Sequence, residues 1–141
     1  MSRRNGNRFL VIISLVLLIV SSAASRPRKT QRLPTGTWGG THIKIEVGPR
    51  SAAIEYDCAN GRIDGPFTID SKGGFKWRGV HNREHGGPIR LDQKRNSRPA
   101  IYSGSVKGDT MTLTVKFADT LEVIETYTLK RGSSGRVRKC R

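Results

Sequence analysis

The sequence predicts an all-β protein, a small antiparallel barrel or sandwich of seven or eight strands. From residue 36 onward apolar and polar residues alternate, which is the period of half-buried strands. Residues that favour turns recur about every ten positions. No stretch of this region keeps the 3.6-residue period of an amphipathic helix. A closed barrel and an open sandwich produce the same alternation, so both architectures remain open.

Each alternating run is expected to form one strand, closed by a glycine- or proline-containing turn. After an opening segment at 36–38, the expected strands are 43–47, 54–58, 67–69, 75–79, 102–106, 111–117 and 121–129. The pair Asn60-Gly61 favours a hairpin turn after the second of these strands. The apolar positions of the strands are predicted to fill one core: Trp38, Ile43, Ile45, Ile54, Tyr56, Phe67, Ile69, Phe75, Trp77, Val106, Met111, Leu113, Val115, Phe117, Tyr127 and Leu129.

The polar stretch from Val80 to Pro99 interrupts this pattern. It contains few apolar residues, and we interpret it as a loop or an irregular excursion. Long loops in compact domains are more often functional than not, so this loop and the barrel end beside it are the expected binding surface. The expected ligand-binding residues are Trp77, His81, Arg83, Glu84 and His85.

The first 24 residues are expected to be a secretory signal peptide. Three arginines within the first eight residues precede the run 9–20, in which only Ser14 is polar, and small residues follow at 21–25. Cleavage is expected after Ala24. The apolar run is shorter than the roughly 20 residues of a spanning helix, and an uncleaved anchor is the alternative. We therefore expect a secreted or periplasmic protein.

Export favours a disulfide between the only two cysteines, Cys58 and Cys140. Closing a loop of about 80 residues contributes roughly 4 kcal/mol in the chain-entropy model. A domain of about 105 ordered residues has a small core, so such a link is useful to its stability.

Positive charge is concentrated at the two ends of the mature chain. The net charge is +15, but residues 33–129 hold 13 basic and 11 acidic residues. We expect a basic flexible segment at 25–35, a β domain at 36–131, and a basic tail at 132–141 tethered by Cys140. The basic ends predict non-specific attraction to anionic surfaces. No aromatic residue interleaves them, so no specific nucleic-acid platform is expected.

His81-Asn82-Arg83-Glu84-His85 matches the inverted zinc-protease pattern, in which two histidines bind zinc and the glutamate acts as base. Glycines flank the motif, which disfavours the required helix, and on a strand Glu84 would face away from both histidines. A metal-dependent hydrolase, or a metal site that also uses His42, is the lesser alternative. The sequence contains no other catalytic or cofactor motif, so no enzyme, cofactor or metal is expected.

Gly36-Thr37-Trp38 resembles the G-x-W motif that opens the first strand of lipocalins and their barrel relatives. The resemblance implies that Trp38 closes one end of a barrel and that Arg131, after the last strand, covers its ring by a cation–π contact. The segments GTWGG, EYDCANG, EHGGP and TMTLTV together resemble a group of uncharacterised exported bacterial proteins, which implies export and a β fold.

These features predict an exported, monomeric β-barrel that binds a small apolar molecule, an envelope component or a secreted protein. The alternative is a structural protein that adheres to anionic polymers through its basic ends. This alternative predicts that binding to anionic polymers falls steeply with added salt.

Overall fold

The computed structural model describes residues 29–84, 87 and 97–140. The expected signal peptide and His85 lie outside these residues. The described chain forms ten strands: β1 (Gln31–Arg32), β2 (Gly36–Gly40), β3 (Ile43–Val47), β4 (Ser51–Tyr56), β5 (Ala59–Asp64), β6 (Thr68–Ile69), β7 (Gly74–Arg83), β8 (Ser97–Lys107), β9 (Thr110–Phe117) and β10 (Val123–Arg131). Within the described ranges, no helix has the length and hydropathy needed to cross a bilayer.

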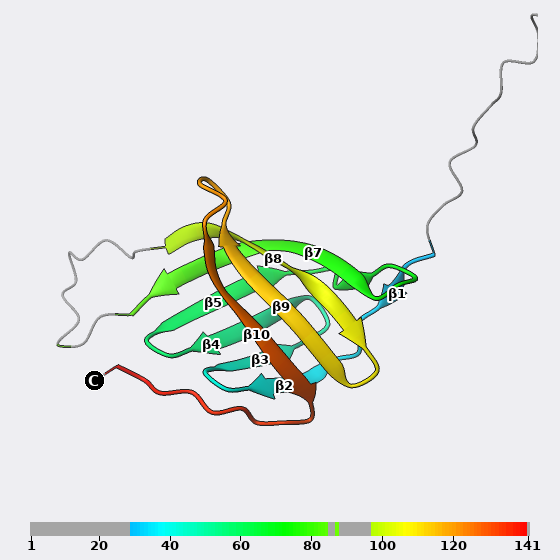
Figure 1. Ribbon diagram of the computed structural model, residues 1–141, viewed down its shortest axis with the longest axis horizontal. Coiled ribbons are helices and arrows are strands. Elements are labelled where there is room, and N and C mark those ends of the chain that lie inside the picture. Colours follow the sequence, from blue (N-terminus) through cyan, green and yellow to red (C-terminus); the bar gives the residue numbers. More distant parts are fainter. Residues whose placement is uncertain (1–28, 85–86, 88–96, 141) are drawn as a thin grey trace, which may run out of the picture.

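Eight strands close into an antiparallel barrel in the order β10-β2-β3-β4-β5-β7-β8-β9 (Figure 1). Each barrel strand pairs with the next barrel strand along the chain, so β5 pairs with β7. The last strand, β10, returns to pair with β2, where Arg131 lies opposite Trp38. The predicted all-β class is confirmed, and closure decides between the two predicted architectures. Closure pairs every strand of the barrel on both sides, which leaves no free sheet edge.

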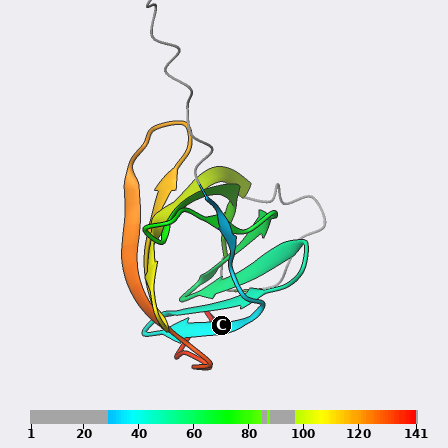
Figure 2. The same cartoon turned by 90° about the vertical axis from the view of Figure 1, so that its right-hand side faces the viewer.

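The two remaining strands, β1 and β6, pair with each other and cap one end of the barrel. Figure 2 shows β1 crossing in front of that end. Leu33 and Phe67 are buried there, and the Leu33 N–H donates to the carbonyl oxygen of Phe67 at 2.8 Å. Residues 31–33 were expected within a flexible segment, and this part of the expectation is wrong. The burial of Leu33 fixes them to the domain.

Side chains fill the interior of the barrel. Of the sixteen predicted core residues, all but Val106 and Phe117 are buried, and those two are partly buried. The core also takes in residues that the pattern missed: Leu33, Val47, Ala52, Ala59, Ile63, Ala100 and Tyr102. An eight-stranded barrel can enclose its own side chains or one small ligand, and here the buried core side chains occupy the interior. Space for a ligand must therefore lie at an end of the barrel.

The turn predicted at Asn60-Gly61 is wrong, because both residues lie within β5. The turn comes earlier, where Tyr56 pairs with Ala59 and Cys58 adopts a positive φ of 54°. Gly61 is required in the strand itself. A side-chain carbon there would come within 2.5 Å of the Tyr102 hydroxyl, so the missing side chain makes room for Tyr102 in the core.

The loop predicted from Val80 to Pro99 is also wrong at both of its ends. β7 continues to Arg83 and β8 begins at Ser97, and Val80 pairs with Pro99 across them. These strand ends lie at the end of the barrel opposite β1 and β6. Their side chains are polar because they lie beyond the apolar core of the barrel. The last strand begins at Val123 rather than at residue 121, because residues 118–122 form the turn between β9 and β10.

The chain after β10 lies along the outside of the barrel (Figure 1). We call residues 132–140 the C-terminal strap. It runs from the end of β10 toward the turn between β4 and β5. Arg136 forms a parallel bridge with Thr41, its N–H donates to the carbonyl oxygen of Gly40 at 2.9 Å, and its own carbonyl accepts the N–H of His42 at 2.7 Å.

Candidate functional site

The end of the barrel opposite β1 and β6 holds an open cleft of about 900 Å³, which we call the mouth cleft. Strands β4, β5, β7, β8, β9 and β10 all contribute to its lining. Four ring side chains and five charged side chains line it: Tyr56, His81, Phe117 and Tyr127, with Asp57, Arg83, Arg98, Glu122 and Glu125. Its volume is about twice that of the hollow of about 450 Å³ lined by Trp38 and Arg131.

The four rings form a continuous aromatic wall. The ring centroids of Tyr56 and His81 lie 5.2 Å apart, and those of Tyr56 and Tyr127 lie 5.7 Å apart. Phe117 meets His81 edge-on, with 5.9 Å between ring centroids. Each of these residues lies at or next to the cleft end of the inward-facing row of its strand, so the wall is continuous with the core below it.

Two polar atoms in this wall are buried without a hydrogen-bond partner among the described residues, the Tyr56 hydroxyl and Nδ1 of His81. The neighbouring Tyr102 hydroxyl donates its own proton to the carbonyl oxygen of Val80 at 2.8 Å. Leaving a buried polar group unpaired costs about 1–3 kcal/mol, and such groups in native proteins are rare. Both atoms belong to residues whose rings line the mouth cleft.

Burial sets the protonation of both residues. Burial first, and then the charges of Arg83 and Arg98, lower the pKa of His81, so its ring is neutral at pH 7. Burial is also the main cause that raises the pKa of Tyr56 well above its usual value. At neutral pH the wall therefore presents a phenol donor and a neutral imidazole.

Arg98 stands at the edge of the cleft over the face of Phe117, its guanidinium carbon 3.6 Å from the ring centroid. Its Nη2 donates to both carboxylate oxygens of Asp119, each at 2.9 Å. These hydrogen bonds are the main cause that lowers the pKa of Asp119. Ring and carboxylate together hold the arginine in one orientation.

A carboxylate faces the same cleft from β10. Glu125 alternates with Tyr127 and Leu129 along β10 and lies opposite the buried Val115, so it belongs to the inward-facing row. Its Oε2 accepts the Tyr127 hydroxyl at 2.9 Å. Burial first, and then this hydrogen bond and the charge of Glu125, raise the pKa of Tyr127.

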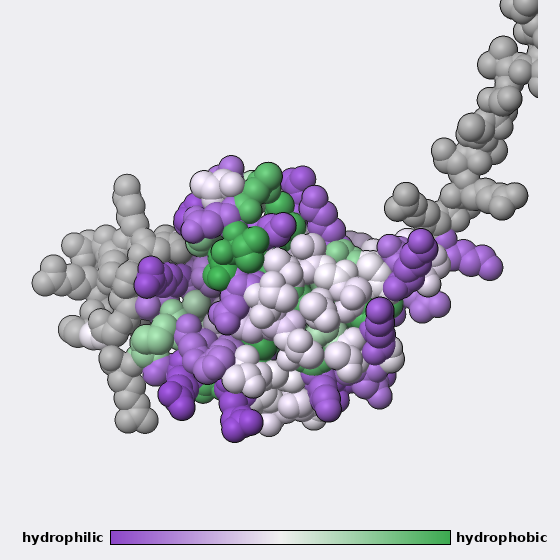
Figure 3. Space-filling view, in the orientation of Figure 1, coloured by the Kyte–Doolittle hydropathy of each residue, from purple (hydrophilic) through white to green (hydrophobic). Residues whose placement is uncertain are grey.

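The turn between β9 and β10 projects above the barrel beside the cleft. Its Leu121 is 63% exposed and has a positive φ of 59°, and Val123 is 52% exposed. Figure 3 shows a hydrophobic patch over this projecting turn. The mouth cleft therefore has an apolar lip on one side.

The structure brings together only some of the expected ligand-binding residues. His81 and Arg83 both line the mouth cleft. Glu84 points elsewhere and accepts the side chains of Asn60 at 2.8 Å and Lys139 at 3.3 Å. Trp77 belongs to the core toward the capped end, where its ring stacks on Phe75 at 4.0 Å.

The sequence interpretation missed Tyr56, Arg98, Phe117, Glu125 and Tyr127 as site residues. Three of them looked like ordinary core residues of their strands. The available signal was the polar residues in the inward-facing rows, where the alternation calls for apolar side chains.

Trp38 and Arg131, expected to close the barrel, lie opposite each other at the capped end. Trp38 is 1% exposed, and both residues line a smaller hollow of about 450 Å³. In the part of the chain that the structure describes, the arginine found over an aromatic ring is Arg98, at the other end of the barrel.

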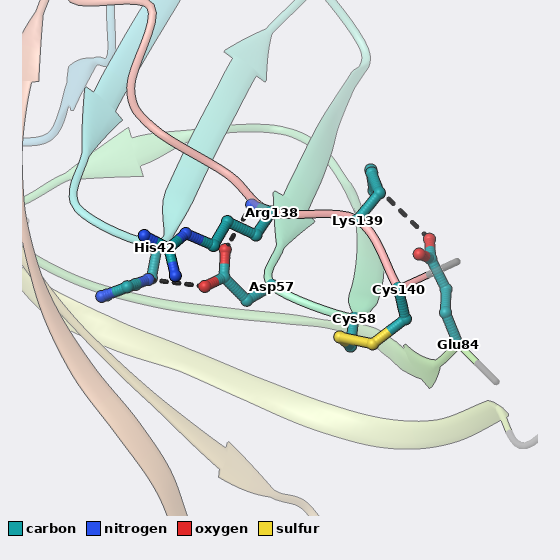
Figure 4. Close-up of a disulfide and its surroundings, with 7 residues drawn as sticks. All are labelled: His42, Asp57, Cys58, Glu84, Arg138, Lys139 and Cys140. Carbon is teal, nitrogen blue, oxygen red and sulfur yellow. Dashed lines mark hydrogen bonds and ion pairs between the residues drawn. A yellow bond between two sulfur atoms is a disulfide. The ribbon is translucent and has the colours of Figure 1, made fainter. Parts of the chain in front are cut away.

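The predicted disulfide between Cys58 and Cys140 is confirmed, with 4.8 Å between the two Cα atoms (Figure 4). Beside it, the Asp57 carboxylate accepts the N–H of Arg138 at 2.6 Å and lies 2.5 Å from Nδ1 of His42. The N–H of Arg138 is the main cause that lowers the pKa of Asp57. The basic tail is therefore tethered by Cys140 as expected, and the bond joins it to Cys58, which lines the mouth cleft.

Among the described residues, no three histidine, cysteine or acidic side chains lie close enough together to hold a metal ion. His42 pairs with Asp57 beside the strap, whereas His81 lines the cleft.

The chain matches no protein-family model, no curated protein and no solved structure. Its function is therefore argued from the geometry of the mouth cleft.

Proposed function

We propose that this chain is an exported binding protein that holds a small molecule in the mouth cleft. The observation that carries the proposal is the pair of unpaired buried atoms, the Tyr56 hydroxyl and His81 Nδ1, in the wall of an open cleft. Pockets for small molecules are typically concave and aromatic, with a few polar groups that orient the ligand. The mouth cleft has each of these features.

The ligand would lie against the aromatic wall at the end of the barrel rather than inside it, because side chains fill the interior. A flat or apolar body would pack on Phe117 and Tyr127, and a polar group would pair with Tyr56 and His81. Small apolar molecules and envelope components with a ring and a hydrogen-bonding group both fit this description. The proposal includes no chemical step.

Export rests on the apolar leader-like segment at residues 9–20 and on the disulfide. Structural disulfides persist mainly in oxidising compartments. A ligand met by this protein would then be a component of the periplasm or of the extracellular medium.

The test is a fluorescence titration of the disulfide-bonded chain with anilinonaphthalene sulfonate, a ringed anionic probe. We expect saturable binding that Phe117→Ala weakens about ten-fold or more, because the ring forms the apolar wall. Arg78→Ala, on the outward face of β7, is the control and should leave binding unchanged. Non-saturable binding, or equal binding by the Phe117→Ala chain, would overturn the proposal.

A further inference from the structure

Four of the five charged side chains that line the mouth cleft are sorted by sign across its opening, and the fifth is Asp57, after β4. Arg83 and Arg98 come from β7 and β8, whereas Glu122 and Glu125 come from the turn before β10 and from β10 itself. In the closed barrel, β7 and β10 are separated by β8 and β9 on one side and by β2, β3, β4 and β5 on the other. The basic and acidic groups therefore approach the cleft from different walls.

The charges around His81 and Tyr127 show the same separation of basic from acidic groups. The charges that act on His81 come from Arg83 and Arg98, and both lower its pKa. The charges of Glu125 and Asp57 act on Tyr127 instead and raise its pKa. Tyr56 lies between these two residues, with its ring 5.2 Å from His81 and 5.7 Å from Tyr127.

One group on each wall is left for a ligand. Arg98 already donates to Asp119, but Arg83 makes no ion pair with any described residue. Glu125 accepts the Tyr127 hydroxyl through Oε2, and within the described chain it makes no ion pair. Glu125 lies in the inward-facing row of β10, opposite Val115, at the exposed end of that row beside the cleft.

We propose that the mouth cleft binds a zwitterion with an apolar or aromatic body, of the kind formed by a free amino acid or a short peptide. The carboxylate of the ligand pairs with Arg83, its ammonium group pairs with Glu125, and its side chain packs on the wall formed by Tyr56 and Phe117. This inference rests on the proposed function of the cleft and adds the charge pattern of the ligand.

The test compares three forms of one molecule by calorimetric titration of the full disulfide-bonded chain. The forms are phenylalanine, its N-acetyl derivative, which lacks the ammonium charge, and its amide, which lacks the carboxylate. The dipeptide of two phenylalanines separates an amino-acid site from a peptide site. We expect the tighter-binding zwitterion, phenylalanine or the dipeptide, to bind about ten-fold more tightly than either form with one charge. The reason is that each lost charge removes a charge-assisted hydrogen bond.

Two variants test which charge of the ligand pairs with each wall of the cleft. Arg83→Gln should abolish the preference over the amide, and Glu125→Gln should abolish the preference over the N-acetyl form. Arg78→Gln and Glu55→Gln are matched controls on the outward faces of β7 and β4, and they should retain both preferences. Equal binding of the three forms, or no binding of any zwitterion, overturns the inference. If anilinonaphthalene sulfonate still binds in the cleft, the proposed function stands alone; if it does not, both fail.

Discussion

The backbone of Gly135 lies directly against Gly39, so closely that a side-chain carbon on Gly39 would overlap the amide nitrogen of Gly135. Gly135 itself has a positive φ of 67°, and a side-chain carbon there would overlap the carbonyl oxygen of Ile43. The C-terminal strap can therefore lie this close to the barrel only because Gly39 and Gly135 have no side chains.

Gly39→Ala is expected to destabilise the protein by about 1–3 kcal/mol, because the strap must move away from β2 to admit the methyl group. Urea denaturation followed by tryptophan fluorescence measures the change. Ser134→Ala, at an exposed position of the same strap, is the control and should be near neutral. Equal stability of the two variants would show that the strap is not held against β2.

The disulfide is expected to contribute about 4 kcal/mol, because it closes a sequence separation of 82 residues. The double variant Cys58→Ser with Cys140→Ser should unfold at a lower urea concentration than the oxidised parent chain. Reductant should lower the midpoint of the parent chain toward that of the variant and leave the variant unchanged. A variant as stable as the oxidised chain would contradict a structural role for the bond.

Asp57 makes the stability of the strap pH-dependent. The pKa of this carboxyl is lowered in the folded state, chiefly by the N–H of Arg138, so its contribution is present above about pH 4. That contribution is lost as the pH falls through the folded-state pKa. The parent chain should therefore exceed Asp57→Asn in stability at pH 7, and the difference should shrink below pH 4.

Denaturation of both chains between pH 2 and 7 gives this comparison. Asp64→Asn is the matched control, since Asp64 and its partner Arg62 are both well exposed and such pairs contribute little. A constant difference between parent and Asp57→Asn at all pH values would exclude the carboxylate as the cause.

His81 is expected to titrate below its value in the unfolded chain, because burial and two arginines oppose its protonation. Between the folded pKa and the ordinary histidine value of 6.5, the folded state binds fewer protons than the unfolded state. Stability should therefore fall as the pH is lowered through this window. A nuclear magnetic resonance titration of the imidazole measures the pKa directly. Arg83→Gln should raise it, and a folded value at or above the unfolded one would refute this account of the cleft.

The fold class and most of the core could be predicted because the alternation of β3, β9 and β10 depends directly on which face is buried. The turn at Asn60-Gly61 was misplaced, because local turn chemistry competed with a requirement for space around Tyr102 that only the closed barrel creates. Local propensity does not report such a tertiary requirement.

The candidate site was less predictable than the fold. His81 and Arg83 were predicted as site residues because they lie in the polar stretch 80–99, which interrupts the alternating pattern. Tyr56 and Tyr127 gave no such signal, because an inward-facing tyrosine at the end of a strand looks like any other core residue. Glu125 continues the alternation of Leu129 and Tyr127 in β10, so its charge in that row was a signal that the sequence interpretation did not use.

Backbone amide chemical-shift mapping with anilinonaphthalene sulfonate tests the central claim most directly, because it locates the bound molecule on the barrel. The account predicts that the largest shifts fall around the mouth cleft, at Tyr56, Ala59, His81, Arg98 and Tyr127. Shifts confined to the capped end around Leu33 and Trp38, or spread evenly over the outer face of the barrel, would contradict it.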